Sequence, residues 1–160
     1  MTRISDSRGN QADAFDLITT KKFAWQILHG EKNLDFRDLT PLYIRKFLVW
    51  HGTLQETLDA AETKDCDYIH FHNNSNTWFL DVKIGDIFIF GVHPQGIPIL
   101  HRYGCHDYDE AAEEYAHKSV DDPDIPFLFA FELKGVVNTS LCPISEVEQK
   151  GRKKVIRVLK

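Results

Sequence analysis

Short segments rich in aromatic and β-branched residues recur along this 160-residue chain, without a regular alternation of strands and helices. A doubly wound α/β fold requires that alternation. The pattern therefore predicts an α+β fold, in which about eight strands form a mixed sheet closed into a barrel and two or three helices decorate it. The expected strands are 14–18, 34–36, 47–50, 68–72, 78–82, 87–90, 97–100, 127–137 and 154–159.

Length and composition predict a single domain. Hydrophobic residues make up 42% of the chain, which suffices for one core at this length. The polar start predicts a flexible N-terminus over residues 1–12 and a domain over 13–160. No run of 18 apolar residues, no signal peptide and no CxxC pair is present, so we expect a cytoplasmic protein without membrane association, disulfides or cofactor.

Charge is unevenly distributed along the chain. The formal net charge is −5, yet residues 145–160 carry six basic and only two acidic residues. The overall balance argues against a protein that coats duplex nucleic acid. Two interpretations of the basic end remain open: the solvent face of the strand expected at 154–159, or a docking segment for an acidic partner in a protein-interaction module.

The most informative segment is residues 14–38. A strand leads through Thr19 and Thr20, either of which can cap a helix over 21–29, and Gly30 ends that helix. In the following strand, Asp35 and Arg37 share one face, because side chains alternate. If Lys32 bends back over that face, the three side chains form a compact charged cluster. The alternative is an exposed ion-paired hairpin that contributes little energy.

This segment resembles the signature of the ASCH family, whose members are PUA-like β-barrels. The signature is a helix ending in an apolar pair, followed by Gly-x-Lys-x-x-Glu-x-Arg; here Gly30, Lys32 and Arg37 match, and Asp35 occupies the acidic position. Residues 49–52 and 84–86 resemble a later strand and turn of the family. The match covers residues 15–37 closely and extends weakly to about residue 90.

The resemblance implies a cleft that binds RNA, a nucleotide or a modified nucleoside. Lys32 and Arg37 are expected to contact phosphate or a base edge, and Asp35 to hold Arg37 or accept from a base. The complete predicted site is Lys22, Lys32, Asp35, Arg37 and His51. Trp25 or Trp50 could offer a stacking face, although we expect both in the core.

A hydrolase is the alternative from another class. Some ASCH proteins are amidohydrolases of N4-acetylcytidine, with a lysine, a threonine three residues later and a glutamate from a later helix. Here Lys32 matches the lysine, Asp35 replaces the threonine, and Glu110, Glu113 or Glu114 could supply the glutamate. A hydrolase of acetylated cytidine, or a ribonuclease, would use Lys32 as base and Asp35 to orient water.

A metal site is a further alternative. His70 and His72 share one strand face, and His101, Cys105 or His106 could complete a zinc site. The spacing is irregular, so we favour polar histidines on a strand face and predict no metal. The acidic helix expected over 107–118 is interpreted as a solvated face.

Overall fold

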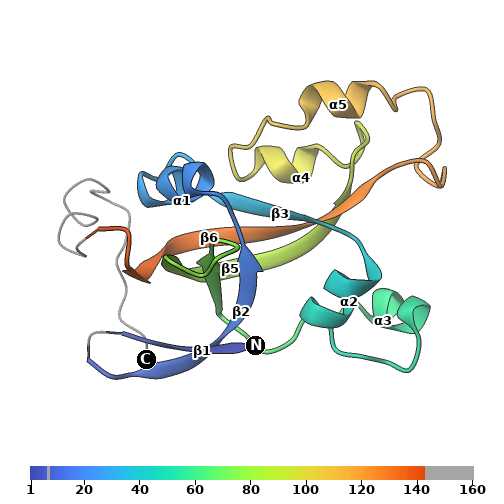
Figure 1. The fold of residues 1–160 in the computed structure, drawn as a ribbon. Coiled ribbons are helices and arrows are strands. Elements are labelled where there is room, and N and C mark those ends of the chain that lie inside the picture. The colour runs from blue at the N-terminus through green and yellow to red at the C-terminus, as the bar shows by residue number, and fades with distance from the viewer. Residues whose placement is uncertain (7, 143–160) are drawn as a thin grey trace. The chain divides into compact units, whose positions relative to one another are not determined.

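The computed structural model describes residues 1–6 and 8–142 (Figure 1). The strands are β1 (Thr2–Ser5), β2 (Gln11–Ile18), β3 (Leu34–Asp38), β4 (Tyr68–His72), β5 (Phe79–Gly91) and β6 (Phe127–Thr139). The helices are α1 (Lys21–Leu28), α2 (Pro41–Phe47), α3 (Leu54–Ala60), α4 (Pro98–His101) and α5 (Asp109–Glu113). Among these described helices, none has both the length and the apolar character needed to span a bilayer.

The six strands form one mixed sheet in the order β1-β2-β4-β5-β6-β3. β2 pairs with β4 in parallel, whereas β1–β2, β4–β5 and β3–β6 are antiparallel. The α+β class is therefore confirmed. The sheet is not closed among the described strands, so the barrel stays a prediction, and the described chain has five short helices where two or three were expected.

The described residues divide into two compact units. The first contains residues 1–33, 64–85 and 133–142, and the second contains residues 34–63 and 86–132. In the first unit, Ile4, Ala14, Tyr68 and Val137 form a buried apolar cluster. The second unit has a larger cluster of Leu34, Phe90, Val92, Ile97, Leu100, Cys105, Ala112, Leu128 and Ala130. The prediction of one domain over 13–160 stays a prediction.

The N-terminal residues include a strand that the sequence does not predict. Thr2–Ser5 form β1, which pairs with β2 from Thr2 opposite Ala14 to Ser5 opposite Gln11. The flexibility expected for residues 1–12 stays a prediction. Ile4 is buried in the apolar cluster of the first unit. The packing of Ile4 in this cluster anchors an otherwise polar segment to the first unit.

Three further elements differ from the prediction. No strand forms at 47–50: Phe47 is the buried last residue of α2, and Leu48 makes only an isolated β-bridge with Thr63. The strand expected at 97–100 is largely α4, which has a proline at its first position. β5 continues through Gly85-Asp86, where a turn was expected. The strand expected at 154–159 lies outside the described residues.

Candidate functional site

α1 and the turn after it place Lys22 and Lys32 on the first unit. The Thr20 side chain accepts a hydrogen bond from the Phe23 backbone N–H, which caps the helix as predicted. Ala24, Ile27 and Leu28 are buried, whereas Lys22 and Phe23 remain exposed. The helix thus turns its apolar stripe inward and leaves its first turn accessible to solvent.

The turn after α1 directs Lys32 back toward the start of the helix. Gly30 adopts a φ of 73°, a left-handed conformation that favours glycine after a helix. The backbone N–H groups of Glu31 and Lys32 both donate to the Gln26 carbonyl oxygen, at 2.8 and 3.2 Å. Lys32 Nζ then lies 5.0 Å from the centroid of the Phe23 ring, within the range of a cation–π contact. We call Lys22, Phe23 and Lys32 the basic–aromatic patch.

A small hollow of about 20 Å³ lies beside Lys32 in the first unit. Its lining includes Gly30, Lys32 and Asn33 after α1, and Lys134 and Gly135 on β6. That volume corresponds to roughly one water molecule, so the hollow is too small for a nucleobase. Lys32 therefore borders a hollow that does not hold a nucleobase, and the ligand-binding cleft expected from the sequence stays a prediction.

Asp35 and Arg37 lie on β3 in the second unit and form an ion pair, as predicted. Arg37 Nε donates to Asp35 Oδ2 at 2.8 Å. The two residues lie opposite Phe131 and Phe129 of β6, and cross-strand partners share a sheet face. Phe47 of α2 contacts both phenylalanine rings, with centroids 4.7 and 5.2 Å away, so α2 covers this face.

The Asp35–Arg37 pair is consequently buried. Asp35 is only 3% exposed and the Arg37 side chain 13%. Burial alone would lower the pKa of Arg37, but attraction to Asp35, together with hydrogen bonds to Asp35 and Tyr43, raises it above its ordinary value. The guanidinium therefore stays charged. Because the pair is buried, the alternative of an exposed ion-paired hairpin is wrong.

His51 occupies a different position in the second unit. Its backbone N–H donates to Thr57 Oγ1 at 2.9 Å, and its Nε2 lies 2.9 Å from Glu62 Oε2. The neighbouring Trp50 is 42% exposed, with the Arg45 guanidinium 4.0 Å from its ring centroid. The expectation of a buried Trp50 is therefore wrong, because stacking on Arg45 accommodates the ring at the surface.

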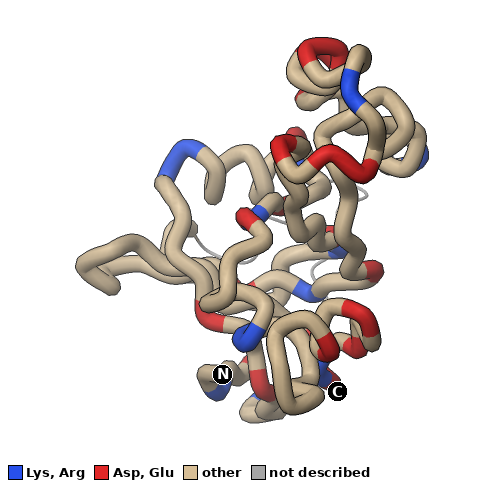
Figure 2. The backbone as a smooth tube through the Cα atoms, turned by 90° about the vertical axis from the view of Figure 1, so that its right-hand side faces the viewer, with Lys and Arg blue, Asp and Glu red and all other residues tan. Residues whose placement is uncertain are grey.

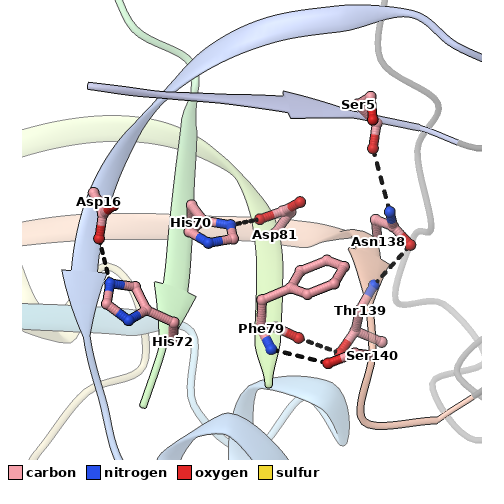
Figure 3. A network of polar contacts seen from close by, with 9 residues as sticks. All are labelled: Ser5, Asp16, His70, His72, Phe79, Asp81, Asn138, Thr139 and Ser140. Carbon is pink, nitrogen blue, oxygen red and sulfur yellow. Dashed lines mark hydrogen bonds and ion pairs between the residues drawn. The ribbon is translucent and has the colours of Figure 1, made fainter. Parts of the chain in front are cut away.

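The histidines of β4 form a polar cluster in the first unit (Figure 3). Each imidazole is hydrogen-bonded to a different carboxylate, His70 to Asp81 on β5 and His72 to Asp16 on β2. The two rings lie 5.6 Å apart. Both histidines are polar strand-face residues, as favoured from the sequence, and a carboxylate partner fixes the orientation of each ring.

Burial distinguishes the His70–Asp81 pair from its neighbour. The hydrogen bond to Asp81 raises the pKa of His70. Burial raises the pKa of Asp81, which is 3% exposed, although His70 opposes that shift. The sequence indicates that the two histidines share a strand face. It does not indicate their carboxylate partners, because Asp16 on β2 and Asp81 on β5 are distant from them in the sequence.

The structure thus distributes the predicted site residues over several places. Lys22 and Lys32 share the basic–aromatic patch of the first unit, whereas Asp35, Arg37 and His51 belong to the second. Phe23 is a functional candidate that the sequence prediction missed, although an apolar residue beside Lys21-Lys22 was a usable signal.

Comparisons with family models, curated proteins and solved structures find no match for this chain.

Proposed function

We propose that this chain is an ASCH-like protein with a PUA-like barrel, and that it binds single-stranded RNA or a nucleotide through the basic–aromatic patch. One observation carries the proposal: Lys32 Nζ lies over the ring of Phe23, which is 41% exposed. An accessible ring offers a face on which a base can stack, and an adjacent lysine can meet the phosphate. A base that stacks on Phe23 displaces the ammonium group toward the backbone of the ligand.

The charge distribution favours a short single-stranded ligand. Figure 2 shows Lys and Arg positions spread along the tube and interspersed with Asp and Glu positions. The described residues 107–124 are strongly acidic in sequence. Duplex binding relies on many phosphate contacts along an extended basic surface. A patch of two lysines and one aromatic ring suits one or two nucleotides.

Asp35 and Arg37 enter the proposal as a structural pair. Their ion pair joins two positions of β3 beneath α2, and Tyr43 of α2 also contacts the guanidinium. We assign ligand contact to Lys22 and Lys32, and assign to Asp35 and Arg37 the maintenance of β3. The ligand contacts expected from the sequence for Asp35, Arg37 and His51 are not part of this proposal and stay predictions.

The hydrolase alternative also stays a prediction. Its mechanism requires Asp35 to orient a water molecule, yet this carboxylate is buried and occupied by Arg37 Nε. If the chain nevertheless releases acetate from N4-acetylcytidine, the Asp35→Asn variant should lose that activity under conditions in which circular dichroism shows that it is still folded, because loss of the charge that pairs with Arg37 also destabilises the variant.

Fluorescence anisotropy with a labelled single-stranded RNA of mixed sequence at low salt tests the binding proposal. Loss of one stacking contact costs about 1–3 kcal/mol, so Phe23→Ala should weaken binding about 5-fold or more. Lys32→Ala should weaken it as well. Arg102→Ala and Leu42→Ala, which remove an exposed cation and an exposed apolar side chain of the second unit, are the matched controls. Absence of association, or equal losses in patch and control variants, would overturn the proposal.

A further inference from the structure

Two histidines and one aspartate converge in the second unit. His101 Nε2 lies 2.8 Å from Asp109 Oδ1, and His106 Nδ1 lies 3.1 Å from Asp109 Oδ2. The two imidazole centroids are 4.4 Å apart. One potential ligand atom from each of the three residues lies within 4.8 Å of the others. Ligand atoms around a tetrahedral zinc ion are separated by about 3.4 Å, so a small adjustment suffices to surround an ion.

The backbone between His101 and Asp109 holds this arrangement. The N–H groups of Tyr103 and Cys105 donate to the Leu100 carbonyl oxygen, at 3.0 and 3.1 Å. The Asp109 N–H donates to the His106 carbonyl oxygen at 3.2 Å. Leu100 and Cys105 are buried, so the two histidines extend from a packed turn. The ligands are thereby brought together before any ion binds, which reduces the entropic cost of binding.

A pocket of about 420 Å³ adjoins the cluster. His101 and Asp109 belong to its lining, together with Pro94, Ile97, Glu110 and Glu113. This volume falls within the usual range for small-molecule sites. An ion bound by His101 and Asp109 therefore lies at the border of a space that can admit water or a small ligand.

We propose that His101, His106 and Asp109 form a binding site for a divalent transition metal ion such as Zn²⁺. Imidazole nitrogen favours zinc, copper, nickel and iron over Mg²⁺ and Ca²⁺, which prefer all-oxygen sites. Three protein ligands leave at least one coordination position open in a tetrahedral site. Water or a ligand in the adjoining pocket occupies that position. The site is independent of the basic–aromatic patch, so either proposal can fail alone.

Titration of the full chain with Zn²⁺ in a calorimeter, and with Co²⁺ by visible absorption, tests this site. We expect one saturable site. The absorption spectrum of the bound Co²⁺ should be typical of an ion with a low coordination number. His101→Ala and His106→Ala should each weaken binding about 10-fold or more, because each removes a metal ligand. Mg²⁺ and Ca²⁺ should not compete at equal concentration. The three ligand side chains are partly or largely exposed, so these variants should unfold at the same temperature as the parent.

His117→Ala is the matched control, since it removes another exposed histidine of the second unit. His70→Ala tests the other histidine cluster. Unchanged Zn²⁺ affinity in both His101→Ala and His106→Ala overturns the proposal, as does the absence of saturable binding. Loss of the site in His70→Ala instead, with His101→Ala unaffected, assigns the ion to β4 and likewise overturns it.

Discussion

Two arginine–aspartate pairs in this chain differ in their contact with solvent. The Arg37–Asp35 pair is almost fully buried on β3, whereas the side chains of Arg3 and Asp13 are 61% and 54% exposed. The N–O distances are similar, 2.8 and 3.0 Å. The surrounding protein therefore decides how much each pair contributes, because a buried charge that loses its partner cannot be compensated by water.

We expect Asp35→Ala to lower the free energy of unfolding by about 3–5 kcal/mol, because Arg37 keeps its charge inside the second unit. Asp13→Ala should lower it by about 1 kcal/mol or less, since solvent screens the exposed pair. Urea unfolding of both variants measures the difference. Equal losses in the two variants would show that β3 is open to solvent.

At the same scale, the His70–Asp81 pair predicts a pH dependence of stability. The hydrogen bond to Asp81 raises the pKa of His70 above its ordinary 6.5, so the folded state retains this proton to higher pH than the unfolded state. The resulting stabilisation is complete below about pH 6.5 and is lost as the pH rises through the folded-state pKa. The raised pKa of Asp81 also makes the free energy of unfolding fall as the pH rises through that pKa, because ionisation of this carboxyl costs the folded state more than the unfolded state.

Between pH 6 and 9, the free energy of unfolding should therefore fall less steeply in His70→Gln than in the parent chain. Urea unfolding across that range measures both slopes, and His117→Gln provides the reference for loss of an exposed imidazole. Parallel curves for the parent and His70→Gln would contradict the coupling to Asp81.

At the scale of elements, threonine marks the start of three helices. Thr20, Thr40 and Thr53 precede α1, α2 and α3, and each side chain accepts a hydrogen bond from the backbone N–H three residues later. The start at Thr20 is predicted from the sequence. The start at Thr40-Pro41, which combines a capping residue with a proline at the first helical position, is not, and the strand expected at 47–50 overlaps the last residue of α2.

Thr40→Ala should destabilise the protein by about 1 kcal/mol, because the first turn of α2 loses the acceptor for the Tyr43 N–H. Thr40→Ser keeps a hydroxyl at the same place and should retain most of the stability. Thermal or urea unfolding of the two variants makes the comparison. If serine destabilises as much as alanine, the methyl group rather than the hydrogen bond stabilises this helix start.

At the scale of the whole molecule, the formal net charge of −5 limits the electrostatic part of any nucleic-acid affinity. Contact through Lys22 and Lys32 neutralises about two phosphates, so the logarithm of the binding constant should fall with the logarithm of salt concentration with a slope of about −1.4. Lys32→Ala should reduce that slope by about 0.7. Anisotropy titrations at several salt concentrations measure it, and a slope steeper than about −4 would require basic residues beyond the patch.

The sequence by itself determined the features that depend on near neighbours in the chain. The cap at Thr20, the helix end at Gly30 and the shared face of Asp35 and Arg37 follow from backbone geometry within a few residues. Only the tertiary structure decided that α2 and β6 bury this ion pair and that Asp81 becomes the partner of His70. Burial and cross-strand pairing arise between segments far apart in the chain, where local patterns carry no information about which surfaces meet.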